Sequence, residues 1–156
     1  MSELMPDPVA MKHYKSKQWG FSLDVPRRWN AFPAVPSHSP YEVIRFASHE
    51  AGHHLIIISR APHDPGKTPQ EHVQNAQTFL ERQGFSNFVY GTAVIASRPA
   101  QMLDCDRTVG DGPWSCRNYF LFNGLATAYG LGFGSSDWGA MQGLFERVAQ
   151  SFEAPD

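Results

Sequence analysis

The dipeptide Asn123-Gly124 constrains the fold of this chain more than any other short segment, because it separates two strand-like runs. Asn-Gly readily adopts the positive φ angles that a two-residue hairpin turn requires. The run 114–122 is rich in aromatic residues, and the run 125–133 alternates small and large side chains. We therefore expect these runs to pair as antiparallel strands.

Other runs show the same strand character and are bounded by turn-forming residues. The alternation of apolar and polar residues predicts further strands at 19–25, 41–48, 53–60, 85–97 and 99–107. Between the first two of these, residues 27–35 are expected to form a turn or a short helical corner. The thirteen glycines and twelve prolines are typical of a chain with many turns.

Two segments carry helix signals. Thr68 is a predicted N-cap that forms a capping box with Glu71, Pro69 suits the first helical position, and Gly84 ends the helix. Its apolar stripe is Val73, Ala76 and Leu80. A second helix is predicted at 137–152, capped by Ser135 or Ser136, with the stripe Trp138, Met141, Leu144, Phe145, Val148 and Phe152. The predicted fold class is α+β, with an antiparallel sheet of about six to seven strands and two main helices.

The segment His49-Glu50-Ala51-Gly52-His53 matches the zinc-protease pattern H-E-x-x-H. In a helix, histidines four residues apart share a face and can bind one Zn²⁺, while the glutamate activates a water molecule. Here the flanking runs 41–48 and 53–60 favour strands, and Gly52 disfavours a helix. We therefore expect a hairpin turn in which Gly52 takes a positive φ.

Two metal-binding alternatives stay open for this segment. A zinc-dependent hydrolase would use His49, Glu50 and His53. Adventitious metal binding at the tip of the hairpin would use His49, His53 and His54. The expectation is a protein without a catalytic site, a cofactor or a resident metal.

Length and charge restrict the class of protein. The 156 residues fit one domain, and we expect residues 1–12 to be a flexible N-terminal segment and 13–154 to be the folded domain. Met1 and Met11 are both possible native starts. The first residues lack the features of a signal peptide, which indicates a soluble, cytoplasmic protein. The net charge of −2 does not favour binding to nucleic acid.

Cys105 and Cys116 are separated by a turn-rich segment, residues 108–113. A hairpin centred between Gly110 and Asp111 places the two cysteines directly opposite each other on neighbouring strands. Two free thiols are expected in a reducing compartment, and a redox switch is the alternative.

Small residues occupy every second position near the last predicted strand: Ala126, Ala128, Gly130, Gly132 and Gly134. Alternate residues of a strand share one face, so one face of this strand has almost no side chains. The first interpretation is that a helix of the same chain, 137–152 or 69–83, packs there. The second is a shallow apolar groove for a partner's helix or a hydrophobic ligand.

The two ends of the chain resemble the PsbP-like superfamily, which includes an extrinsic photosystem II subunit, a Ran-binding nuclear-import factor and bacterial DcrB-like proteins. The resemblance rests on Gly20-Phe21-Ser22, on Leu23, Val25, Pro26 and Trp29, and on a last helix that ends in Ser151-Phe152. It implies a three-layer α/β/α sandwich without a shared catalytic apparatus. It also implies a role in binding another protein, whose identity and stoichiometry the sequence leaves open.

Overall fold

The computed structural model describes residues 9–35, 37, 39–48, 54–64, 66–109, 112–123 and 127–155. In chain order, the elements are β1 (Met11–Lys15), β2 (Ser22–Pro26), β3 (Asn30–Pro33), β4 (Glu42–Ala47), β5 (His54–Pro62), α1 (Pro69–Arg82), β6 (Ser86–Ile95), β7 (Arg98–Val109), β8 (Gly112–Asn123), β9 (Thr127–Ser135) and α2 (Trp138–Gln150). The predicted strands 85–97, 99–107, 114–122 and 125–133 correspond to β6, β7, β8 and β9.

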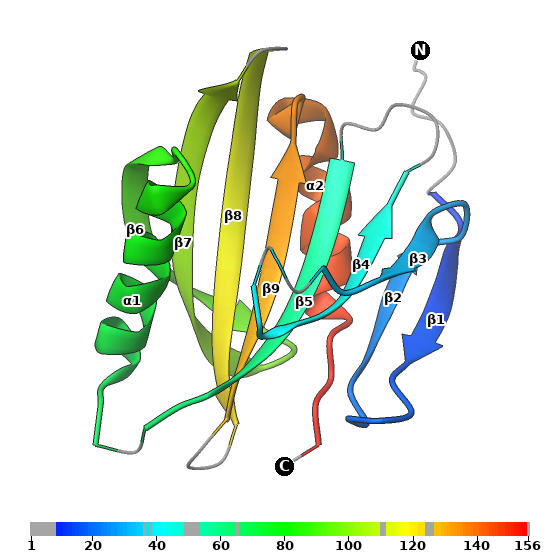
Figure 1. The fold of residues 1–156 in the computed structure, drawn as a ribbon. Coiled ribbons are helices and arrows are strands. Elements are labelled where there is room, and N and C mark those ends of the chain that lie inside the picture. Colours follow the sequence, from blue (N-terminus) through cyan, green and yellow to red (C-terminus); the bar gives the residue numbers. More distant parts are fainter. Residues whose placement is uncertain are drawn as a thin grey trace.

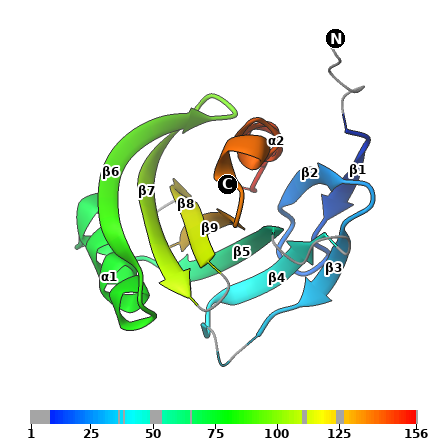
Figure 2. The ribbon, with the colours of Figure 1, turned by 90° about the horizontal axis from the view of Figure 1, so that it is seen from above.

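Seven strands form one antiparallel sheet in the order β3-β4-β5-β9-β8-β7-β6. The sheet curves around α2, and α1 lies on its opposite side (Figures 1 and 2). We call the side that faces α2 the inner face and the side that carries α1 the outer face. This arrangement confirms the predicted α+β class and the three-layer sandwich.

The first two strands form a separate ribbon, β1–β2. Met11 pairs with Pro26 and Lys12 pairs with Val25, so the last two residues of the segment that we expected to be flexible lie in a strand. The ribbon packs beside α2 in the inner layer, where the backbone N–H of Asp24 donates to Ser151 Oγ at 2.8 Å. The N- and C-terminal parts of the domain are joined in this way.

The main core lies between the inner face of the sheet and the layer formed by the ribbon and α2. Its fully buried side chains come from all of these elements and include Phe21, Leu23, Phe46, Ile56, Ile58, Tyr129, Leu131, Phe133 and Val148. Burial of each such side chain stabilises the fold by about 1.5–3 kcal/mol. The odd-numbered residues of β9 therefore belong to the core, and its even-numbered residues point to the outer face.

Two local predictions were wrong. Residues 27–35 were expected to form a turn or helical corner, but Asn30–Pro33 forms β3, which pairs with β4. The N-cap of α2 is Asp137, whose Oδ1 accepts from the N–H of Ala140, whereas Ser135 was one of our two candidates. Ser135 is still in β9, and its hydroxyl accepts from the N–H of Asp137.

The prediction for α1 was correct in detail. Thr68 Oγ1 accepts from the N–H of Glu71, and the Glu71 carboxylate accepts from the N–H of Thr68. Gly84 follows the helix with a φ of 91°, the left-handed conformation that favours glycine. Among the described residues, no helix is long and apolar enough to cross a membrane.

Candidate partner-binding face

The outer face of the sheet is covered by α1 at one end only. Val73 of α1 packs against Leu103 of β7 and Phe120 of β8, which forms a small second core. α2 packs on the inner face, where Phe145 contacts Phe133 with ring centroids 5.2 Å apart. Of the two helices expected to cover the small-residue face of β9, α2 packs on the opposite face of that strand and α1 packs mainly beyond it.

The small residues of β9 form a strip on the outer face. Gly130 lies opposite Ser59, Gly132 opposite Ile57 and Gly134 opposite Leu55 of β5. Ala128 continues the strip and is buried, with 1% of its surface exposed. Ala126, the remaining predicted member, lies outside the described residues.

The strip owes its shape to close neighbours in the sheet. A Cβ atom at Gly134 would lie 2.6 Å from the indole ring of Trp114, and one at Gly132 would lie 3.0 Å from Asn118 Oδ1. Gly132 and Gly134 thus allow β8 side chains to lean across β9. Gly130 has more space, since Ser59 Cβ would lie at 3.5 Å.

Beyond β5, the outer face has an apolar hollow of about 370 Å³, lined by Phe32, Pro33, Val35, Arg45, Ala47 and Leu55. Phe32 is 40% exposed and Val35 is 37% exposed, and both border this hollow. No pattern in the sequence predicted this hollow, because its residues come from three segments that meet only when β3, β4 and β5 pair.

The wall of the hollow is braced by a salt bridge between Arg45 and Glu42. Arg45 Nη2 donates to Glu42 Oε1 at 2.9 Å, and the N–H of Val35 donates to Glu42 Oε2 at the same distance. The Glu42 side chain is buried, so its charge must be paired and hydrogen-bonded. This network holds the β3–β4 connection against β4.

The flanks of the H-E-x-x-H match are strands. β4 and β5 pair from Glu42–Ser59 to Ala47–Leu55, which confirms the predicted hairpin and does not supply the helix that a zinc protease needs. Residues 49–53 lie outside the described residues. His54 Nδ1 and Ser135 Oγ share a 2.8 Å hydrogen bond, and the His54 ring stacks on Trp29. Both contacts give His54 a structural role.

Cys105 and Cys116 lie directly opposite each other on β7 and β8, as predicted, and both are free thiols. The hydrogen bond with Cys105 raises the pKa of Cys116, and burial raises it further. A thiol with a raised pKa is a poor nucleophile at neutral pH, because little of it is thiolate.

Other charged groups on the sheet serve as braces. Arg117 Nε donates to Asp104 Oδ1 at 2.8 Å, which raises the pKa of the guanidinium. Tyr119 Oη donates to Glu146 of α2 at 2.9 Å, and burial raises the pKa of Tyr119 to about 12. In the described part of the chain, no three His, Cys, Asp or Glu residues are grouped to hold a metal ion.

Comparison with solved structures identifies the fold. The solution structure of cyanobacterial PsbP (CyanoP) from Synechocystis sp. PCC 6803 matches with a TM-score of 0.71 and 14% identity, over 99% of this chain and 98% of that protein. LpqN of Mycobacterium tuberculosis, involved in cell envelope biogenesis, matches with a TM-score of 0.63 and 13% identity, over 93% and 92% of the two chains. The fold is therefore PsbP-like, as the resemblance implied.

A protein from Bacteroides thetaiotaomicron also matches, with a TM-score of 0.67 and 14% identity. This chain covers 48% of that protein, and the match includes 93% of this chain. No family model and no curated protein matches the sequence. At these identities the comparisons show the fold alone.

Proposed function

We propose that this PsbP-like domain is a non-enzymatic accessory protein that binds an apolar helix of another protein on the outer face of its sheet. The observation that carries the proposal is the strip of small residues on β9 beside the hollow at Leu55. A seven-stranded sheet is wide enough for two helices side by side on one face. Here α1 occupies only the part over β6, β7 and β8.

The side chains on the remaining part of the outer face suit such a helix. Ile57, Leu55 and Ala47 offer half-buried apolar surface, and Phe32 and Val35 are exposed beside them. A partner helix with apolar residues at every third or fourth position could place them over the strip and in the hollow. Gly130, whose Cβ position only Ser59 approaches within 4 Å, allows the partner backbone to approach the sheet closely.

The test uses one substitution on this face and a matched one elsewhere. Ile57→Lys places a charge at the centre of the proposed contact, and Val89→Lys places the same charge on β6, where Val89 is 60% exposed. A partner is isolated from the native host with the wild-type protein, and its binding segment is then synthesised. We expect Ile57→Lys to weaken binding of that segment at least about tenfold, because a buried lysine has no partner there.

The remaining outcomes of this experiment are distinct. If Ile57→Lys does not change the affinity for the segment, the outer face is not the binding site. An equal loss with Val89→Lys indicates a general effect of charge. If circular dichroism of the bound segment shows no helical signal, the partner does not bind as a helix and the proposal is wrong. The proposal keeps the cytoplasmic location expected from the sequence, which cell fractionation tests.

A carrier of a hydrophobic small molecule is the second candidate, because the hollow of about 370 Å³ has the volume of a small-ligand pocket. Mass spectrometry of an organic extract of the purified protein separates it from a helix-binding protein. The zinc hydrolase is tested by metal analysis and by Glu50→Gln, which removes the base of that mechanism and leaves the strands unchanged.

A further inference from the structure

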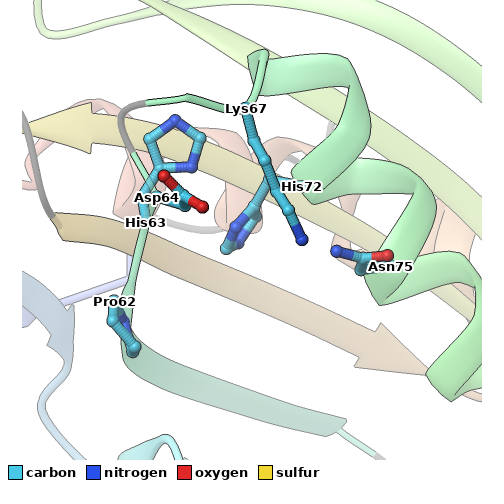
Figure 3. A pocket seen from close by; sticks show the side chains of 6 residues that line it. All are labelled: Pro62, His63, Asp64, Lys67, His72 and Asn75. Atoms are coloured by element: carbon cyan, nitrogen blue, oxygen red, sulfur yellow. The ribbon is translucent and has the colours of Figure 1, made fainter.

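A second hollow of about 330 Å³ lies where the chain passes from β5 to α1. It is lined by Pro62, His63, Asp64, Lys67, His72 and Asn75 (Figure 3). These residues come from the end of β5, from the β5–α1 connection and from the first two turns of the helix. None of them belongs to the strip or to the hollow described above.

Two aromatic side chains of β8 support the histidines. The ring centroids of His63 and His72 are 5.6 Å apart, and both rings contact Phe122, at 4.7 Å and 5.4 Å. His72 also packs edge-on to Phe120 at 5.8 Å. Packing against these two phenylalanines of the sheet therefore holds the two imidazoles in place.

Polar groups of these residues point into one space. Figure 3 shows the side chains of Lys67, His72 and Asn75 directed toward one another, whereas Asp64 lies beside His63. Asp64 Oδ1 accepts from the N–H of Gly66 at 2.8 Å, so part of its charge is used within its own loop. Among the described residues, Lys67, His72 and Asn75 form no side-chain hydrogen bond with the protein.

The titratable groups around the hollow are Lys67, His63, His72 and the carboxylate of Asp64. Burial lowers the pKa of His72, and the nearby His63 and Lys67 lower it further. Glu71, on the first turn of α1, is already hydrogen-bonded in the capping box, where its carboxylate accepts from the N–H of Thr68. The strands beneath contribute the uncharged Phe120, Phe122 and Ala128. A bound anion would be attracted by Lys67 and would favour the protonated form of His72.

We infer that the hollow between the β5–α1 connection and α1 binds a small oxyanion, a phosphate or carboxylate group, through Lys67, His72 and Asn75. Lysine supplies the permanent positive charge, and the amide of asparagine supplies a neutral donor. A protonated imidazole adds a charge-assisted hydrogen bond, so the anion and a proton on His72 bind together. Binding is therefore stronger in mildly acidic solution than in alkaline solution.

The test is an NMR titration of the full-length protein with inorganic phosphate, with acetate and, at equal ionic strength, with chloride. At about pH 6, where histidine is partly protonated, phosphate or acetate should shift the ring signals of His63 and His72 and raise the pKa of His72. If only phosphate shifts these signals, the hollow is a phosphate site. If phosphate and acetate both shift them, it is a general oxyanion site. Equal shifts with chloride overturn the proposal.

Variants assign the shifts to this site. Lys67→Gln changes an exposed residue and should weaken binding about tenfold, which corresponds to one charge-assisted hydrogen bond. His72→Gln should do the same and should also abolish the increase in affinity for acetate, whose charge is constant in this range, as the pH falls from about 8 to about 6. His13→Gln, on β1 at the opposite end of the domain from α1 (Figure 1), is the matched control and should bind as the wild type does.

The outcomes are decisive even if one variant is unstable. Should His72→Gln fail to fold, Lys67→Gln in the same titration still separates binding at the hollow from binding elsewhere. Unchanged affinity in Lys67→Gln, or an equal loss in His13→Gln, overturns the inference. The readout is independent of any partner protein, so failure here leaves the proposed helix-binding face untouched.

Discussion

The indole ring of Trp114 occupies the space that a side chain at Gly134 would need. A Cβ atom at that position would lie 2.6 Å from the ring, closer than real Cβ atoms approach other heavy atoms. The two residues lie on neighbouring strands, and Gly134 pairs with Cys116. The last glycine of the strip therefore exists to accommodate a β8 side chain of the same molecule.

Gly134→Ala should lower the free energy of unfolding by about 1–3 kcal/mol, because the indole must move out of a packed position. Urea denaturation followed by tryptophan fluorescence measures the loss and reports the environment of the ring. The matched control is Gly143→Ala on α2, where a Cβ would have nothing within 4 Å. That change should stabilise the protein by up to about 1 kcal/mol, since alanine is the better helix former. Equal effects of the two substitutions would contradict the close contact.

The Cys116 thiol should react slowly with iodoacetamide in the folded protein. Its pKa is raised by the hydrogen bond with Cys105 and by burial, so the thiolate is scarce. The raised pKa also predicts that stability is full below the pKa of an unfolded cysteine, about 8.5, and declines as the pH rises above it. Mass spectrometry after alkylation at about pH 8 checks the first expectation. The expectation is wrong if Cys116 is alkylated as fast in the folded protein as in the protein unfolded by urea.

The burial of His72 predicts a loss of stability in acid. Its pKa is lowered in the folded protein, so the unfolded chain takes up the proton first as the pH falls. The contribution of His72 to the free energy of unfolding is therefore full above about pH 6.5 and declines below it. Thermal unfolding between about pH 8 and pH 5 measures the slope, and His72→Gln should make it shallower. An identical slope in that variant would rule out the assignment to His72.

The capping box of α1 should make a measurable contribution to stability. Thr68→Ala removes the hydroxyl that accepts from the N–H of Glu71 and should cost about 1 kcal/mol. Thr78→Ala, the same substitution inside the same helix, removes a hydroxyl that donates to the carbonyl of Gln74. Because alanine favours a helix interior, the control should be neutral or slightly stabilising. Chemical denaturation of both variants compares the two positions directly.

Some features of this protein were predictable because they depend on residues close in the sequence. The start of α1 follows from Thr68 and Glu71, three residues apart. The pairing of Cys105 with Cys116 follows from the position of the turn between them, since a hairpin leaves only one partner for each residue. The position of the glycines on one shared face of the strand follows from the two-residue period of a strand.

The two hollows could not be predicted in the same way. His63 and His72 lie on a connection and a helix, and no periodicity relates them. They meet because both pack on Phe122 of β8, which lies 50 residues after His72 and 59 residues after His63. The hollow at Leu55 likewise depends on β3, a four-residue strand whose hydrogen-bond partner is supplied by β4.

The amino-acid sequence by itself determined the two helices, the hairpin partners and the strands other than β1 and β3, because alternation, capping and turn chemistry act over a few residues. Only the tertiary structure decided that β1 and β2 form a separate ribbon, that α2 takes the inner face and that α1 covers one end of the outer face. These outcomes depend on which apolar surfaces bury one another across the whole chain. The exposed part of the outer face is what remains after that competition for burial.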